Sequence, residues 1–97
     1  MNITDITIRR IYGDKGRLLG LASIVIDHDV MVYNVKIIQG DDRVFVAMPN
    51  HRGSDGIYRD LVHPLTPEAR RELETAVLEK YREYLNLQEV CADVEEN

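Results

Sequence analysis

The chain has a single cysteine, Cys91, and no long run of apolar residues. One cysteine cannot form an internal disulfide, so the sequence fits a reducing compartment. No segment approaches the roughly 20 apolar residues that a membrane-spanning helix needs. The first residues also lack the basic and then apolar pattern of a secretion signal. We therefore expect a cytoplasmic protein that does not enter a membrane.

Motifs that carry catalysis or hold cofactors are missing as well. The sequence contains no glycine-rich dinucleotide or phosphate-loop pattern, no nucleophile elbow, and no cysteines or histidines at metal-ligand spacing. The three histidines, His28, His51 and His63, leave a metal-dependent enzyme as the least favoured hypothesis. The sequence therefore predicts a protein that acts by binding a partner, with no catalytic residue, cofactor or metal.

Negative charge is concentrated at one end of the chain. The 97 residues have a net charge of −5, which argues against a general nucleic-acid binder. Residues 1–71 hold 10 lysines and arginines against 9 acidic residues, whereas residues 72–97 hold 2 against 8. The acidity therefore belongs to the C-terminal quarter, and a cationic surface can exist elsewhere on the molecule.

Hydrophobic patterning predicts an α+β fold in one domain, residues 1–97. Four segments rich in β-branched and apolar residues are predicted to be strands: 3–11, 18–26, 30–39 and 43–48. Their short polar links can only join antiparallel neighbours, because a parallel crossover needs a dozen or more residues. A polar loop at 50–56 and a short fifth strand at 57–60 follow. The expected fold is an antiparallel β-meander of four to five strands followed by a C-terminal helix.

The predicted helix has a clear start. Thr66 suits the N-cap, Pro67 the first helical position and Glu68 the first turn. Five apolar residues then recur at helical spacing and predict the face that covers the sheet: Leu73, Val77, Tyr81, Tyr84 and Leu85. The last residues, 92–97, are expected to form a disordered acidic tail.

Several arginines are candidate anion-binding residues. Arg70 and Arg71 lie at the helix start, where free backbone N–H groups also attract phosphate. Arg52 and Arg59 lie in or beside the polar loop. On helix physics alone the alternative for Arg70 and Arg71 is at least as well supported, namely that they form ion pairs with Glu68, Glu72 and Glu74 on a solvated surface. Arg59 has a similar alternative partner in Asp55. A second candidate cluster combines Arg9 or Arg10, which should point to opposite faces of a strand, with Lys15 and Arg17.

The segment at residues 43–65, RVFVAMPNHRGSDGIYRDLVHPL, resembles the signature of the SpoVG (stage V sporulation protein G, septation regulator) family. The shared features are a phenylalanine strand leading to Met-Pro, a basic pair, Asp-Gly, an aromatic residue, Arg-Asp and His-Pro. Further similar residues carry the resemblance over roughly residues 1–85. The resemblance implies a dimeric β-meander with a C-terminal helix, and a regulator that binds DNA or RNA.

The family's nucleic-acid-binding positions correspond to five residues of this chain: His51, Arg52, Arg59, Arg70 and Arg71. One departure matters, because the family's usual lysine before Arg52 is His51 here. A histidine is largely neutral at pH 7. We therefore expect weaker or more pH-sensitive nucleic-acid binding than in relatives that have the lysine.

Two hypotheses follow for the function. The first is a homodimeric nucleic-acid-binding regulator that affects septation, sporulation and gene expression in bacteria. The second is a non-enzymatic adaptor that binds division or regulatory proteins through a sheet edge or the acidic helix. In the second case the arginines are structural, and Arg59 is the residue most open to that interpretation because Asp55 and Asp60 are its near neighbours in sequence.

Overall fold

The computed structural model describes residues 2–12 and 16–96. Its main sheet has four antiparallel strands in chain order: β1 (Ile3–Ile11), β2 (Leu18–Ile26), β3 (Val30–Gln39) and β4 (Val44–Ala47). The predicted four-stranded meander is therefore confirmed, with strand bounds within about a residue of those expected from the pattern. The turn predicted between β1 and β2 falls mainly on residues 13–15, which lie outside the described residues.

The link between β2 and β3 shows how local sequence sets the meander. Asp27 and His28 both have positive φ angles, 54° and 61°, and the N–H of Asp29 donates to the carbonyl of Ile26 at 3.0 Å. Two central residues with positive φ make the tight turn whose twist matches that of paired strands. Aspartate and histidine adopt this backbone more readily than most residues. The polar segment 27–29 is thus a hairpin turn, as predicted.

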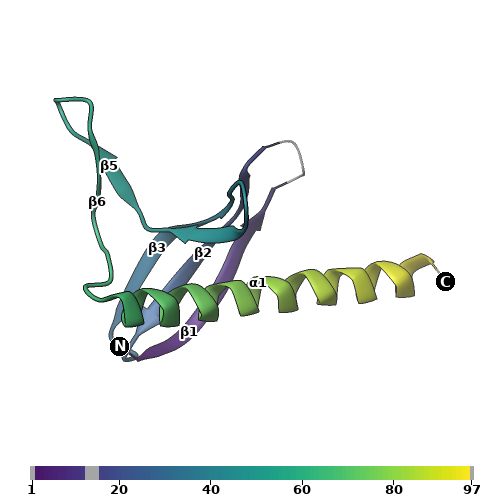
Figure 1. The fold of residues 1–97 in the computed structure, drawn as a ribbon. Helices are drawn as coiled ribbons and strands as arrows, with labels where there is room; N and C mark the ends of the chain where they lie inside the picture. The colour runs from purple at the N-terminus through teal and green to yellow at the C-terminus, as the bar shows by residue number, and fades with distance from the viewer. Residues whose placement is uncertain (1, 13–15, 97) are drawn as a thin grey trace.

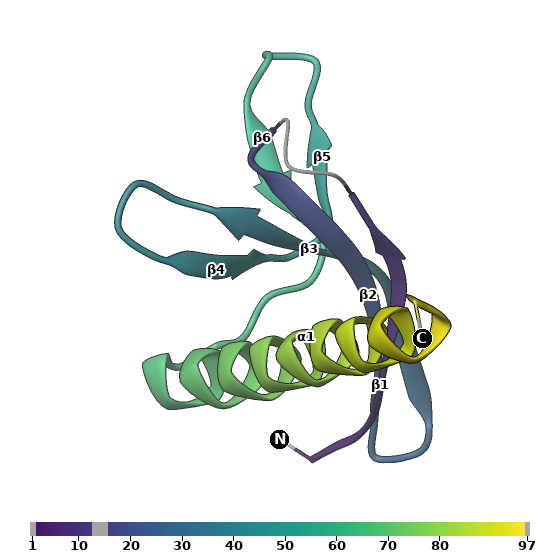
Figure 2. The ribbon, with the colours of Figure 1, turned by 90° about the vertical axis from the view of Figure 1, so that its right-hand side faces the viewer.

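A separate two-stranded sheet follows the meander. It consists of β5 (Asn50–Arg52) and β6 (Tyr58–Asp60), paired antiparallel. Part of the predicted loop at 50–56 is therefore a strand, and the predicted fifth strand pairs with it instead of joining the meander. The two strands form a hairpin that projects away from the rest of the molecule (Figures 1 and 2).

Helix α1 (Pro67–Glu96) covers one face of the main sheet (Figure 1). Its start matches the prediction, because the Thr66 hydroxyl accepts a hydrogen bond from the N–H of Ala69 at 3.1 Å. The helix is assigned through Glu96, further along the chain than the sequence suggested. The disorder expected of residues 92–97 stays a prediction. Figure 1 shows the last turns of the helix extending past the edge of the sheet at β1.

The hydrophobic core lies between α1 and the covered face of the sheet. Leu73 and Val77 are the fully buried helix residues of the predicted stripe, and Tyr81 packs beside them at the margin. Tyr84 is exposed, so its predicted place on the covered face is wrong. The sheet contributes six buried partners, and Met48 just after β4 adds a seventh; the six are Ala22, Ile24, Val32, Val35, Ile37 and Val46. Burying side chains of this size stabilises a fold by about 1.5 to 3 kcal/mol each. The core therefore holds α1 in place, while the β5–β6 hairpin lies outside it.

Candidate nucleic-acid interface

The β5–β6 hairpin brings together three of the five residues predicted to bind nucleic acid. In its register His51 lies opposite Arg59, and Arg52 lies opposite Tyr58. Directly opposed residues share one face of a two-stranded sheet, and adjacent residues take opposite faces. His51 and Arg59 therefore lie on one face of the hairpin, and Arg52 and Tyr58 lie on the other.

Main-chain hydrogen bonds close the tip of the hairpin. The N–H of Gly53 donates to the carbonyl of Ile57 at 2.9 Å, and the N–H of Gly56 donates to the carbonyl of Gly53 at 3.0 Å. Gly56 has a φ of 82°, a conformation that residues with a side chain rarely adopt. The Asp-Gly signal seen in the sequence is thus a tight turn, which holds the two short strands in register.

Asp55 and Arg59 form an ion pair across this turn. The guanidinium of Arg59 donates to the two carboxylate oxygens of Asp55 at 2.8 and 3.3 Å, and the N–H of Ile57 donates to the same carboxylate at 3.0 Å. The Arg59 hydrogen bonds, and then that of Ile57, lower the pKa of the Asp55 carboxyl. The alternative pairing of Arg59 with Asp55 is therefore observed, and Arg59 helps to shape the hairpin.

The opposite face of the hairpin is open. Arg52 is exposed, and its side chain has no hydrogen bond or ion pair with any residue that the structure describes. The Tyr58 side chain beside it is 65% exposed. Its exposure shows that packing within this chain does not account for it.

Arg70 and Arg71 at the start of α1 have different surroundings. The guanidinium of Arg70 donates to the carbonyl of Val46 at 2.8 Å, on the open edge of β4. Glu74, one turn later, accepts from the N–H of Val46 at 3.3 Å. These two side chains bind the edge strand where another strand would otherwise pair. Arg71 is exposed and has no partner among the described residues, so the helix start presents one available arginine instead of two.

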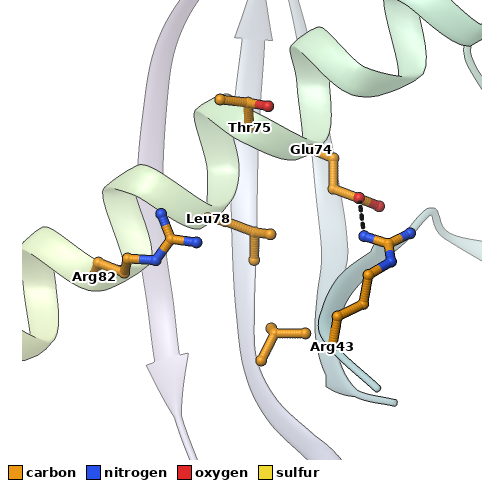
Figure 3. Close-up of a pocket in the computed structure, with 6 residues that line it drawn as sticks. Arg43, Glu74, Thr75, Leu78 and Arg82 are labelled. Carbon is orange, nitrogen blue, oxygen red and sulfur yellow. Dashed lines mark hydrogen bonds and ion pairs between the residues drawn. The ribbon is translucent and has the colours of Figure 1, made fainter. Parts of the chain in front are cut away.

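A groove runs between β4 and α1 next to these contacts. It has a volume of about 400 Å³ and its lining includes Val44, Leu78 and Arg82. Figure 3 shows Arg43 bound to Glu74 at one end of the groove, with Arg82 on the other side of Leu78. The groove therefore combines an apolar floor with two guanidinium groups, of which the one on Arg43 is neutralised.

The backbone of β4 faces this groove at Val44. The N–H of Gly40 donates to the carbonyl of Arg43 at 2.8 Å, which makes these residues a hydrogen-bonded pair. Such pairs alternate along an antiparallel ladder, so Val44 and Val46 both direct their N–H and C=O groups away from β3. Those of Val46 bind Arg70 and Glu74, whereas those of Val44 have no partner among the described residues.

The second cationic cluster lies on the sheet face opposite α1. Arg9 donates to the hydroxyl of the buried Ser23 at 2.9 Å, and its guanidinium lies 5.8 Å from the centre of the Tyr33 ring. A β-bulge between Ile8 and Arg10 interrupts the regular alternation of side chains along β1. Arg10 pairs with Leu21, which lies on the outer face, so Arg9 and Arg10 share that face. The expectation that Arg9 and Arg10 point to opposite faces is therefore wrong.

The remaining members of that cluster do not complete a free cationic surface. Arg17 forms an ion pair of 2.7 Å with Asp41, and Lys15 lies outside the described residues. Within the described part of the chain, no three histidine, cysteine or acidic side chains lie close enough to hold a metal ion. No helix in that part is long and apolar enough to cross a membrane.

The fold and the site define a small α+β protein whose distinguishing feature is a projecting hairpin with cationic side chains. The profile of the SpoVG family matches residues 1–83. A relative from Exiguobacterium sp. is 47% identical over 81 residues, covering 84% of this chain and 81% of the relative. A relative from Bacillus cytotoxicus is 39% identical over 90 residues, covering 93% and 92%.

A third relative, from Brevibacillus brevis, is 42% identical over 81 residues, which cover 84% of each chain. All three carry the name "Putative septation protein SpoVG". The chain therefore belongs to the SpoVG family, a family of septation and regulatory proteins and not of enzymes. The resemblance seen at residues 43–65 is confirmed.

Proposed function

We propose that this protein is a nucleic-acid-binding regulator that acts without catalysis, binds DNA or RNA, and affects septation, sporulation and gene expression. The observation that carries the proposal is the projecting hairpin, on which Arg52 is exposed and free of any ion pair within the described residues. A protruding element can enter a groove or follow a strand of nucleic acid where the body of the protein cannot. The cytoplasmic location belongs to the same proposal.

The cationic residues contribute unequally to this function. Arg52 and Arg71 are the principal phosphate contacts, because neither guanidinium has a partner in the described part of the chain. Arg59 binds Asp55 and Arg70 binds Val46, so both act first on structure and only secondarily on phosphate. His51 adds a polar contact on the Arg59 face and adds charge only when it is protonated.

A homodimer is part of the proposal, because it would present two hairpins to one nucleic acid. Linking two weak sites raises the overall affinity strongly. Two features of this chain support self-association. Within the described residues β1 and β4 each pair with only one strand, and the outer sheet face exposes Met31 and Tyr33. Sedimentation equilibrium measures the expected dimer mass directly.

The test is fluorescence anisotropy with labelled DNA and RNA over a salt series. We expect binding that weakens steeply with salt, because each neutralised phosphate releases counterions. Arg52→Ala and Arg71→Ala should each reduce the slope of log affinity against log salt by about 0.7 to 0.9 for every subunit that contacts the nucleic acid. Arg82→Ala is the matched control, since it removes the same charge from an exposed position on α1.

The outcomes separate the two hypotheses. A lower slope of log affinity against log salt in the Arg52 and Arg71 variants, with an unchanged slope in Arg82→Ala, supports the proposed interface. An equal reduction in all three variants points to nonspecific attraction instead of a site. No binding at low salt by correctly folded wild-type protein contradicts the proposal and favours the adaptor function.

The open backbone at Val44 supports that second candidate function. An adaptor for division or regulatory proteins would accept an extended segment of its partner as an added strand at β4. Val44→Pro removes the outward-facing N–H, and proline is tolerated on edge strands at such positions. If the protein is an adaptor, this variant should fold normally and lose its protein partner. Retention of the partner would exclude strand addition at this edge.

A further inference from the structure

Arg52 and Tyr58 are closer neighbours than their exposure alone suggests. The N–H of Gly53 donates to the carbonyl of Ile57 near the tip of the hairpin. At the other end the N–H of Leu61 donates to the carbonyl of Pro49 at 2.8 Å. Because hydrogen-bonded pairs alternate with non-hydrogen-bonded pairs, Arg52 and Tyr58 form a non-hydrogen-bonded pair. Side chains approach each other most closely in such pairs. The two side chains thus leave the backbone side by side, and the Arg52 guanidinium extends toward the turn, where it would lie 3.7 Å from a β-carbon at Gly56.

The backbone at this pair is also available. In a non-hydrogen-bonded pair the N–H and C=O groups point outward, away from the partner strand. Neither the N–H of Arg52 nor that of Tyr58 has a partner among the described residues outside the hairpin. The two N–H donors point off opposite edges of the hairpin, and the face between these edges offers a π-face and a cation. These are the groups that bind the base and the phosphate of one nucleotide.

The other face of the hairpin accounts for its shape. The Asp55–Arg59 ion pair and the bonds of Gly53 and Gly56 hold the turn, and neither involves Tyr58 or the Arg52 guanidinium. The exposed pair consequently has a fixed backbone beneath it before any ligand arrives. Such preorganisation lowers the entropy lost on binding.

We propose that the Arg52–Tyr58 pair binds an unpaired nucleotide, so that this protein prefers single-stranded nucleic acid to a duplex. The Tyr58 ring stacks on the base, and the Arg52 guanidinium binds an adjacent phosphate. Bases inside a duplex already stack on each other and have no face free for the ring. This inference rests on the proposed function and adds the form of nucleic acid that the hairpin selects.

Asp60 limits where the bound strand can cross the hairpin. It lies opposite Asn50 and shares the face of Arg52 and Tyr58, closer to the base of the hairpin. A carboxylate repels phosphate, so the strand is expected to cross the hairpin toward its tip. The ligand is defined by this chemistry alone, a single strand of RNA or DNA.

The test compares one labelled RNA strand, the DNA strand of the same sequence, and the DNA duplex, by anisotropy at fixed salt. Wild-type protein should bind the single strands more tightly than the duplex. Tyr58→Leu should lose about tenfold or more of single-strand affinity with little change on the duplex, whereas Tyr58→Phe should keep it. Tyr84→Leu is the matched control, because Tyr84 is also an exposed tyrosine and lies on α1, outside the hairpin and the outer sheet face.

A second readout comes from fluorescence. The chain contains no tryptophan, so Tyr58→Trp introduces a single reporter at the stacking position. Single strands should quench its emission, and the duplex should not. Circular dichroism confirms that each variant is folded.

The results distinguish the inference from the function on which it rests. Salt-dependent binding that is equal for strands and duplex, and unchanged in Tyr58→Leu, overturns the inference and leaves the proposed function standing. Loss in Tyr84→Leu but not in Tyr58→Leu overturns it too and moves the site to α1. No binding of any nucleic acid at low salt overturns both.

Discussion

Asp55 and Arg59 are joined across the tip of the hairpin, and the α-carbon of Gly53 lies directly against the pair. A β-carbon at position 53 would come within 2.8 Å of the Asp55 carboxylate and 2.9 Å of the Arg59 guanidinium. Real β-carbons do not approach polar atoms that closely. The absence of a side chain at Gly53 thus lets the ion pair close over the turn.

Gly53→Ala should separate Asp55 from Arg59 while leaving the fold intact, because the crowded atoms are the ends of flexible side chains. The expected result is a rise in the Asp55 pKa toward its usual range. NMR titration of the Asp55 carboxyl signal measures this rise. Gly16→Ala is the control, since a β-carbon there meets no atom within 4 Å. An unchanged Asp55 titration in Gly53→Ala would contradict the role given to this glycine.

The hairpin should also respond to acid. The hydrogen bonds from Arg59, and then from Ile57, lower the Asp55 pKa in the folded protein below its value in the unfolded chain. The stabilisation from this carboxylate is therefore complete above the unfolded pKa and is lost as the pH falls through the lower, folded value. The protection of the Gly53 and Gly56 amides against hydrogen exchange, relative to the intrinsic rate at each pH, should fall over that range. In Arg59→Gln the change should occur at a higher pH.

His51→Lys should strengthen nucleic-acid binding. His51 lies opposite Arg59 on the exposed hairpin, so a lysine there adds a permanent charge to the cationic face. The slope of log affinity against log salt should steepen by about 0.7 to 0.9, the contribution of one further phosphate contact, for every subunit that contacts the nucleic acid. Salt titration by anisotropy measures this change. His51→Gln, which adds no charge, should leave the slope as in wild type at pH 8, and a steeper slope in both variants would refute the charge explanation.

Arg70→Ala and Arg71→Ala should differ in kind. Arg70 donates to the partly buried carbonyl of Val46, and loss of that bond should reduce the free energy of unfolding by about 1 to 2 kcal/mol. Arg71→Ala should change stability by less than about 0.5 kcal/mol and act on nucleic-acid binding instead. Urea denaturation of each variant, beside its anisotropy titration, separates the two effects. Equal stabilities would remove the structural role assigned to Arg70.

Local pattern was sufficient for the main sheet and the start of the helix. Alternating apolar residues, the polar turn at 27–29 and the Thr66 cap act through neighbours in the chain, so they can be recognised without knowledge of the fold. The pairing of β6 could not be recognised in this way. Three residues of strand carry almost no pattern, and only the closed turn at Gly53 and Gly56 brings β5 and β6 together.

The sequence by itself determined the class of fold, the SpoVG family membership and the short set of cationic candidates. Only the tertiary structure decided which candidates are available, because a guanidinium is free or bound according to what folding places beside it. Folding places Asp55 beside Arg59 and the edge of β4 beside Arg70, and it leaves Arg52 and Arg71 open. It also places Tyr58 next to Arg52, since strand register, unlike sequence spacing, determines which side chains meet.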